Sequence, residues 1–303
     1  MDKPLVSVVI TTHNRLSDFK SALNSVVNQS YKYLEIIVVD NASDNTTKEF
    51  LSKLQDIKIL SIQNFVNGNL ARNKGIYCAR GKYIAFLDDD DEWDNSKVDR
   101  QVQSLEQSDD CGLSYTGMRK VYDHKYSVDS SPNSYYTGDL SKKIFESIFT
   151  NTSTLMVERA LLYDEDIFFD EQLTHWQEYD LLVRLSLVTK FTNIPEALTI
   201  ININSTSKTR LSNQFNKWQH ATKYFYSKYE QRISELDSRT IKMMKINYVN
   251  DAITRLDNKK NVYWKKSKYI VQKILLTKNL RSTVYLIPGI TINTIREKSN
   301  KSK

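Results

Sequence analysis

Residues 86–93 read Phe86-Leu87-Asp88-Asp89-Asp90-Asp91-Glu92-Trp93, so that four aspartates follow directly on the apolar run 83–87. Like charges at neighbouring positions repel, and a folded chain tolerates them best where a cation neutralises them. Mg²⁺ and Mn²⁺ prefer oxygen ligands and typically use one or two carboxylates together with substrate phosphates. Taken alone, the stretch fits a solvated acidic turn equally well, so the surrounding sequence has to decide between the two interpretations.

The residues before this stretch alternate between apolar runs and helical patterns. The short apolar runs, which are rich in β-branched residues, span 5–10, 34–39, 57–62 and 83–87. Helical patterns are found at about 17–27, with Ser17 as a cap, at 48–54 and at 70–79. Near-continuous apolar runs of this length are typical of a parallel sheet that is covered on both faces. The alternation therefore predicts an α/β fold with a doubly wound, mostly parallel sheet, whose strand ends form a nucleotide crevice.

Segments of the chain resemble the motifs of one enzyme family in order and spacing, namely residues 6–15, 36–44, 71–76 and 81–91. They look like family 2, the inverting nucleotide-sugar glycosyltransferases with the GT-A fold, of the bacterial surface-polysaccharide type. The resemblance covers residues 4–204 and implies a GT-A-like domain at 1–204, with a nucleotide-sugar half at about 1–110 and an acceptor half at about 111–204. It implies transfer of a sugar, expected from a UDP-hexose such as UDP-galactose or UDP-glucose, to a hydroxyl of a glycan or lipid-diphosphate-linked acceptor in O-antigen or capsule synthesis.

The resemblance gives the acidic stretch a role in holding the leaving diphosphate through a divalent cation, Mn²⁺ or Mg²⁺, which acts as a Lewis acid. In the family the motif reads Asp-x-Asp-Asp, and its metal ligand matches Asp90, with Asp88 nearby. Asp88 and Asp89 would then contact the ribose or metal-bound water. Because all four positions are Asp, the register is ambiguous by one residue, and Asp91 is an alternative contact for the sugar or the acceptor.

Further donor contacts are expected at the strand ends and in the helix before the acidic stretch: Thr11, His13, Asn14, Asp40, Asn41 and Arg72. The family often has two acidic residues where this chain has Asp40-Asn41, but an Asn side chain both donates and accepts and so suits a uracil edge. His13 stands where the family commonly has Tyr and is a candidate for stacking on the base, or else an ordinary loop residue. Arg72 is a candidate for a forked contact with the diphosphate, or else a surface arginine.

An inverting transferase needs a general base that takes the proton from the acceptor hydroxyl. Residues 175–185 resemble the second acidic motif of the family, which places the base at Glu178, where the family usually has Asp, with Asp180 as the alternative. Both lie in the first turn of a predicted helix, where carboxylates are also favoured by the helix dipole alone. Trp176, just before them, is a candidate sugar-stacking wall for the acceptor, or else a core residue.

The charge of the chain is divided unevenly. Residues 205–303 contain 22 Lys and Arg against 6 Asp and Glu, a net charge of +16, whereas residues 1–204 contain 21 against 30, a net charge of −9. Aromatic-rich helices are expected in this C-terminal region at about 215–229, 241–256 and 261–276, followed by an apolar stretch at 283–290. Basic and aromatic residues mixed along helices favour binding to an anionic membrane surface, and a helical cap packed on the first domain is the alternative.

The remaining features limit the function further. A metal-dependent phosphohydrolase of sugar nucleotides and a nucleic-acid-binding module are the rival functions, but the negative first domain and the lack of an RNA-recognition motif disfavour nucleic acid as a partner. No secretory signal opens the sequence and no apolar run approaches the ~20 residues that span a bilayer, so we expect a cytoplasmic protein, peripheral at the inner face of the cell membrane. The two cysteines, Cys78 and Cys111, are expected to be buried, reduced thiols.

Overall fold

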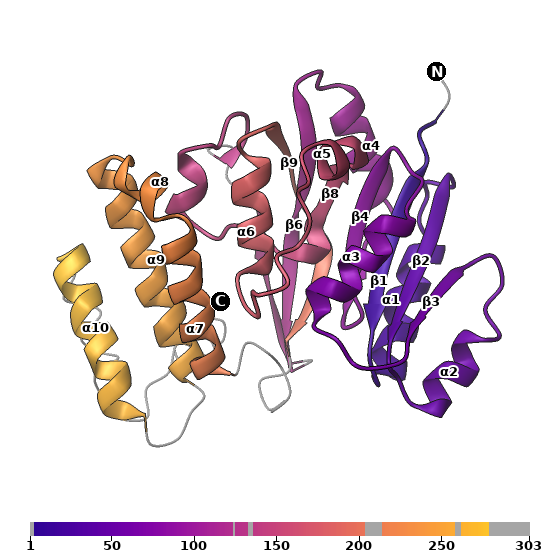
Figure 1. Cartoon of the computed structure of the whole chain (residues 1–303), viewed down its shortest axis with the longest axis horizontal. Coiled ribbons are helices and arrows are strands. Elements are labelled where there is room, and N and C mark those ends of the chain that lie inside the picture. Colours follow the sequence, from indigo (N-terminus) through magenta and orange to yellow (C-terminus); the bar gives the residue numbers. More distant parts are fainter. Residues whose placement is uncertain (1–2, 124, 133–135, 204–213, 258–261, 279–303) are drawn as a thin grey trace. The chain divides into compact units, whose positions relative to one another are not determined.

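The computed structural model describes residues 3–123, 125–132, 136–203, 214–257 and 262–278, and the chain divides into two compact units (Figure 1). Unit 1 comprises Met1–Ile144 and Phe149–Asn204. Unit 2 comprises Phe145–Ile148 and Ser205–Lys303. Unit 1 contains the β-sheet with the helices that cover it, and the described part of unit 2 is helical.

The sheet of unit 1 has nine strands within the described residues. They are β1 Val6–Thr12, β2 Leu34–Asn41, β3 Lys58–Ile62, β4 Tyr83–Asp88, β5 Asp91–Trp93, β6 Cys111–Tyr122, β7 Tyr126–Ser130, β8 Leu155–Glu158 and β9 Lys190–Ile203. Their order is β3-β2-β1-β4-β8-β6-β9-β5, with β7 paired to β6 outside that path. The pairs among β1 to β4 are parallel, β6 and β9 are also parallel, and β8 joins the two parts through antiparallel pairs. The predicted α/β fold is confirmed.

Helices cover both faces of this sheet. They are α1 Leu16–Val27, α2 Asn45–Leu51, α3 Gly68–Cys78, α4 Lys97–Glu106, α5 Arg159–Asp164 and α6 Gln177–Leu185, with short 3₁₀ helices η2 Lys143–Glu146 and η3 Thr152–Thr154. On one face, Val8 of β1 is buried in a cluster with Phe19 of α1 and Val102 of α4. On the other face α3 lies close to β1, because a Cβ atom on Gly75 would come within 2.3 Å of the Val9 side chain. Successive residues of β1 therefore face opposite helical layers, as a sheet covered on both sides requires.

Two predicted helix boundaries were wrong. Helix α1 begins at Leu16 after Arg15, not after a Ser17 cap, and no side chain caps its first turn. Helix α2 begins at Asn45, three residues before the predicted start, because the Asp44 carboxylate accepts a hydrogen bond from the Thr47 N–H and so starts the helix there.

Unit 2 consists, within its described residues, mainly of helices α7 Phe215–Lys228, α8 Glu230–Ser234, α9 Ser238–Asp257 and α10 Tyr263–Thr277. Its core is aromatic: Trp218 of α7 is buried, stacks on Tyr248 of α9 at 5.1 Å between ring centroids, and donates from Nε1 to Asp251 at 2.7 Å. The predicted C-terminal helices are confirmed, while the apolar stretch 283–290 lies outside the described residues. In the part of the chain that the structure describes, no helix combines the length and apolar character that crossing a bilayer requires. Cys78 and Cys111 are free thiols but only partly buried, so their predicted burial was too strong.

Candidate functional site

The carboxyl ends of β1, β2 and β4 lie at one edge of the sheet. In the parallel register Thr11 of β1 stands beside Asp88 of β4, and Thr12 stands beside Asp40 of β2. The sequence therefore brings the predicted donor residues of three separate segments to a common edge, where open α/β sheets bind their ligands.

The acidic stretch is divided among two strands and the turn between them. Asp88 ends β4, Asp89 and Asp90 form the turn, and Asp91 begins β5. Asp89 and Asp91 are each only 3% exposed, whereas the side chains of Asp88 and Asp90 are 25% and 26% exposed. Asp88 and Asp90 are therefore the two carboxylates of the stretch that stay partly open to solvent. The burial pattern thus distinguishes positions that the sequence left equivalent.

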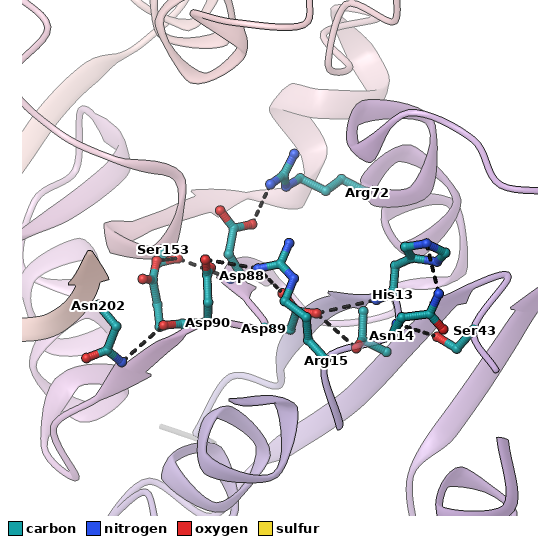
Figure 2. A network of polar contacts seen from close by, with 12 residues as sticks. His13, Asn14, Arg15, Ser43, Arg72, Asp88, Asp89, Asp90, Ser153 and Asn202 are labelled. Carbon is teal, nitrogen blue, oxygen red and sulfur yellow. Dashed lines mark hydrogen bonds and ion pairs between the residues drawn. The ribbon is translucent and has the colours of Figure 1, made fainter. Parts of the chain in front are cut away.

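Two arginines neutralise this turn (Figure 2). Nη1 of Arg15 lies 3.0 Å from Asp89 and 2.9 Å from Asp90, and Arg72 of α3 forms an ion pair with Asp88. Burial alone would lower the pKa of both guanidinium groups, but the neighbouring carboxylates, Asp89 for Arg15 and Asp88 for Arg72, raise it above its ordinary value. Arg72 is 8% exposed and is therefore not the surface arginine that the sequence left possible.

The buried Asp89 carboxylate anchors the turn to the end of β1. It accepts hydrogen bonds from the Thr12 hydroxyl at 3.0 Å and from the His13 N–H at 3.3 Å. Burial raises the pKa of Asp89 to about 7, although Arg15 opposes the shift. A second cation at this turn would favour the ionised carboxylate.

The turn suits a divalent cation that arrives with a phosphate ligand. In the described ranges no group of three or more His, Cys, Asp or Glu side chains is arranged to hold a metal ion by itself. Asp88 and Asp90 supply two partly exposed carboxylates, which is the number that Mg²⁺ or Mn²⁺ commonly takes from a protein when phosphates complete its coordination.

Two side chains from distant segments fix the backbone of the turn. The Ser153 hydroxyl in η3 accepts the Asp88 N–H at 3.1 Å and donates to the Asp91 carboxylate at 2.6 Å. Asn202 in β9 donates to the Asp90 carbonyl oxygen at 3.0 Å. Asp91 is therefore a buried partner of Ser153, and its contact with the sugar or the acceptor stays a prediction.

The predicted base lies near the Asp88–Arg72 pair. Glu178 is half-buried in the first turn of α6, and its charge, after that of Asp88, contributes to the raised pKa of Arg72. Asp180 is fully buried and bonded to Nε of Arg184 at 3.0 Å, which disfavours it as the alternative base. Trp176, with φ of 60°, is 5% exposed and packs edge-on against Tyr179, which favours the core interpretation, and its role as a sugar-stacking wall stays a prediction.

Helix α3 also holds the segment that leads to α6. Asn73 donates to the Phe169 carbonyl at 2.9 Å and accepts the Phe169 N–H at 2.9 Å. Asn69, one turn earlier on the same face, donates to the carbonyl oxygens of Asp170 and Leu173 at 2.7 Å each. The helix that carries Arg72 therefore also fixes the approach to Glu178.

The polar residues after β1 and β2 form the other end of the edge. The amide of Asn41 bonds the Val66 backbone through both of its polar atoms, at 2.8 and 2.9 Å, so the predicted contact with a uracil edge would replace these bonds and stays a prediction. Asn14 accepts the Asp44 N–H at 2.7 Å, which makes it a brace between the two loops. His13 bonds the Asn41 carbonyl at 2.7 Å, and its ring lies 4.6 Å from that of Phe65, which is 64% exposed.

Asp40 is buried beneath these loops. Its Oδ1 atom accepts the Ser43 N–H at 3.0 Å, whereas its Oδ2 atom has no hydrogen-bond partner among the described residues. A buried acceptor without a donor is destabilising, which makes Asp40 a candidate contact for a ligand hydroxyl or N–H.

Several residues of the site were missed in the sequence. Arg15 directly follows Asn14 and ends the motif at residues 6–15. A basic residue in a turn next to an acidic stretch was the signal that could have identified it. Phe65 lies in a polar loop where a lone exposed aromatic was also visible. Ser153 and Asn202 gave no local signal, because each reaches the turn only through the fold of the acceptor half.

Comparison with known proteins places this geometry in a family. The sequence profile described as "Glycosyl transferase family 2" matches residues 7–164. Among curated relatives, an uncharacterized glycosyltransferase of Methanocaldococcus jannaschii is 32% identical over 191 residues, which are 61% of this chain and 65% of that protein. The amylovoran biosynthesis glycosyltransferase AmsB of Erwinia amylovora is 31% identical over 216 residues, covering 63% of this chain and 67% of that protein. An Escherichia coli enzyme, UDP-Glc:alpha-D-GlcNAc-diphosphoundecaprenol beta-1,3-glucosyltransferase WfaP, is 36% identical over 104 residues, which are 34% of this chain and 41% of that protein.

Solved structures agree on the fold. The crystal structure of S. aureus TarS in complex with UDP-GlcNAc has a TM-score of 0.60 at 16% identity and covers 93% of this chain and 84% of that one. The mannosyltransferase PcManGT from Pyrobaculum calidifontis, in complex with GDP-Man and Mn²⁺, has a TM-score of 0.58 at 15% identity and covers 94% of this chain and 79% of that one. The chain belongs to glycosyl transferase family 2 and has the GT-A-like fold that its sequence predicted.

Proposed function

We propose that this family 2 glycosyltransferase transfers a hexose from a UDP-hexose to a hydroxyl of a glycan or a lipid-diphosphate-linked acceptor in bacterial surface-polysaccharide synthesis. The observation that carries the proposal is the pair of partly exposed carboxylates, Asp88 and Asp90, next to the Arg72 guanidinium, whose pKa the charge of Glu178 also raises. Acidic groups for a leaving diphosphate and a carboxylate for an acceptor proton are the two requirements of this reaction.

The donor nucleotide would occupy the sheet edge between the His13 and Phe65 rings and the acidic turn. The exposed face of Phe65 offers a stacking surface for the base, and Asp40 offers an acceptor to the base or ribose. Thr11, half-buried at the end of β1, would border the ribose. UDP is the nucleotide to test first, since uridine donors are named in WfaP and bound in TarS.

A divalent cation, Mn²⁺ or Mg²⁺, would be held by Asp90 together with Asp88 and would neutralise charge on the departing diphosphate. Arg15 and Arg72 pair with these carboxylates in the free protein, so both guanidinium groups are available to phosphate oxygens once the carboxylates take a cation. Glu178 would take the proton of the acceptor hydroxyl as that oxygen attacks from the face opposite the diphosphate.

The acceptor and the location of the enzyme follow from relatives and charge. WfaP acts on a diphosphoundecaprenol-linked sugar, and AmsB serves amylovoran biosynthesis, which motivates a polysaccharide acceptor carried on lipid diphosphate. The net charge of +16 in residues 205–303 favours an anionic membrane surface, so the protein would be peripheral at the inner face of the cell membrane.

Donor binding and acceptor-dependent transfer test this function. UDP with Mn²⁺ should raise Tm more than GDP or ADP with Mn²⁺, because a ligand at a hundredfold excess over Kd stabilises by about 2.7 kcal/mol. UDP release from the matching UDP-hexose should require an acceptor. Equal release with and without acceptor would instead identify a phosphohydrolase, and no Tm response to UDP would reject the donor class.

Ser153→Ala should weaken the response to Mn²⁺. The Asp88 N–H would lose its buried acceptor, at a cost of about 1–3 kcal/mol, and the acidic turn would relax. We expect the Mn²⁺ concentration for half-maximal UDP binding to rise about tenfold, measured by titration calorimetry.

Two variants separate positioning from general stability. Ser153→Thr keeps the hydroxyl and should restore most of the Mn²⁺ response. Ser186→Ala removes another buried hydroxyl, which donates to the Val183 carbonyl within α6, and should lower Tm without changing that response. If Ser153→Ala and Ser186→Ala behave alike, Ser153 has no special role at the turn.

A further inference from the structure

One side of helix α10 carries exposed apolar side chains in a regular row. Trp264 is 84% exposed, Leu275 is 73% exposed and Val271 is 46% exposed. With the exposed Lys268 they occupy positions separated by 4, 3 and 4 residues, which places these four on one face of a helix with 3.6 residues per turn, and the exposed Lys278 follows directly after the helix as its C-cap. We call these five residues the α10 stripe.

The opposite side of α10 packs within unit 2. Lys266, Tyr269 and Ile270 are buried there, at 9%, 7% and 1% exposure. Lys265 lies over the Phe215 ring at 4.3 Å and bonds Gln219 at 3.2 Å, so it also contributes to packing against α7. The basic residues of α10 therefore fall into two groups, of which only the lysines of the stripe are directed away from this packing.

Charge complementarity indicates what covers the stripe. Residues 258–303 contain 12 Lys and Arg but a single acidic residue, Glu297. A second copy of the chain would bring the same positive charge to the contact, whereas an anionic lipid surface would neutralise it. An aromatic ring and aliphatic side chains flanked by lysines are the pattern by which helices lie in a bilayer interface.

We propose that the α10 stripe is the membrane-contact face of this protein. Trp264, Val271 and Leu275 would enter the headgroup boundary of an anionic bilayer, while Lys268 and Lys278 would pair with lipid phosphates. The inference deepens the membrane partner included in the proposed function. It does not depend on glycosyl transfer, because vesicle binding is measured without donor or acceptor.

Vesicle flotation of the full-length protein tests the face. Binding to phosphatidylcholine vesicles should require phosphatidylglycerol and should weaken as salt rises. Lys268→Gln with Lys278→Gln should weaken binding about 25-fold, since each lysine near an anionic surface contributes about fivefold. Trp264→Ser with Leu275→Ser should weaken it about tenfold or more.

Matched controls come from unit 1. Lys20→Gln with Lys74→Gln removes two exposed lysines, and Tyr77→Ser removes an aromatic side chain that is 61% exposed. Neither should change flotation. Equal loss in these controls, no loss in the stripe variants, or equal binding to neutral vesicles would overturn the proposal.

Tryptophan fluorescence gives an independent measurement. Of the four tryptophans, Trp93, Trp176 and Trp218 are at most 5% exposed, so collisional quenching by acrylamide reports mainly on Trp264. Anionic vesicles should protect the protein from quenching, and Trp264→Phe should remove the quenchable signal. If Trp264 is already protected from acrylamide without vesicles, another part of the chain covers the stripe. If its protection grows with protein concentration, the protein self-associates through the stripe. Either result overturns membrane contact.

Discussion

Glu178→Gln should lower kcat by roughly 10²-fold or more while leaving the Kd for UDP unchanged. The substitution keeps the size of the side chain and its place in the first turn of α6 but removes the carboxylate that we propose takes the acceptor proton. UDP release in the presence of acceptor measures kcat, and calorimetry measures UDP binding. A loss confined to UDP affinity, with kcat preserved, would remove Glu178 from the catalytic role.

Asp180→Asn is the control for this assignment, since Asp180 lies two residues away in the same turn. Its carboxylate is buried and paired with Arg184, so the variant leaves a largely buried guanidinium without its counter-charge and should lower Tm. Its kcat per folded molecule should stay near that of the parent. If Asp180→Asn alone loses turnover with an unchanged Tm, the base is Asp180.

Asp90→Ala should abolish the Mn²⁺-dependent part of UDP binding, an effect of about 10²-fold. Asp90 is one of the two partly exposed carboxylates of the acidic turn. A single remaining carboxylate would hold the cation and its diphosphate more weakly than the pair. The fold should remain intact, because the change removes one of several clustered negative charges and Arg15 retains Asp89.

Chelation provides the comparison for this variant. With EDTA present, the parent and Asp90→Ala should bind UDP with the same low affinity. Asp109→Ala, which removes an exposed aspartate outside the site, should behave as the parent under both conditions. If Asp90→Ala binds UDP with Mn²⁺ as tightly as the parent, the cation does not depend on Asp90.

The sequence was sufficient for features that depend on local pattern. The apolar runs 5–10, 34–39 and 83–87 predicted strands β1, β2 and β4, because parallel strands covered on both faces leave that signal. Helical spacing in the same way predicted α6 and placed Glu178 in its first turn.

The rest of the site depends on contacts between distant residues. Ser153 meets Asp88 across 65 positions and Asn202 meets Asp90 across 112, so no local pattern reveals either pair. The Asn41 amide suits a nucleotide base and a peptide backbone equally well. Its bond to the backbone of Val66 becomes visible only in the folded chain. Lys266 belongs to the basic C-terminal region, and only the packing of α10 shows that its side chain is buried.

Helix α3 contacts both the acidic turn and the segment that leads to Glu178. Arg72 holds Asp88, while Asn69 and Asn73 hold the segment that leads to Glu178. Any coupling between two ligand sites is reciprocal for binding free energies. If the sugar nucleotide changes the affinity for the acceptor through α3, the acceptor must change the affinity for the sugar nucleotide by the same factor.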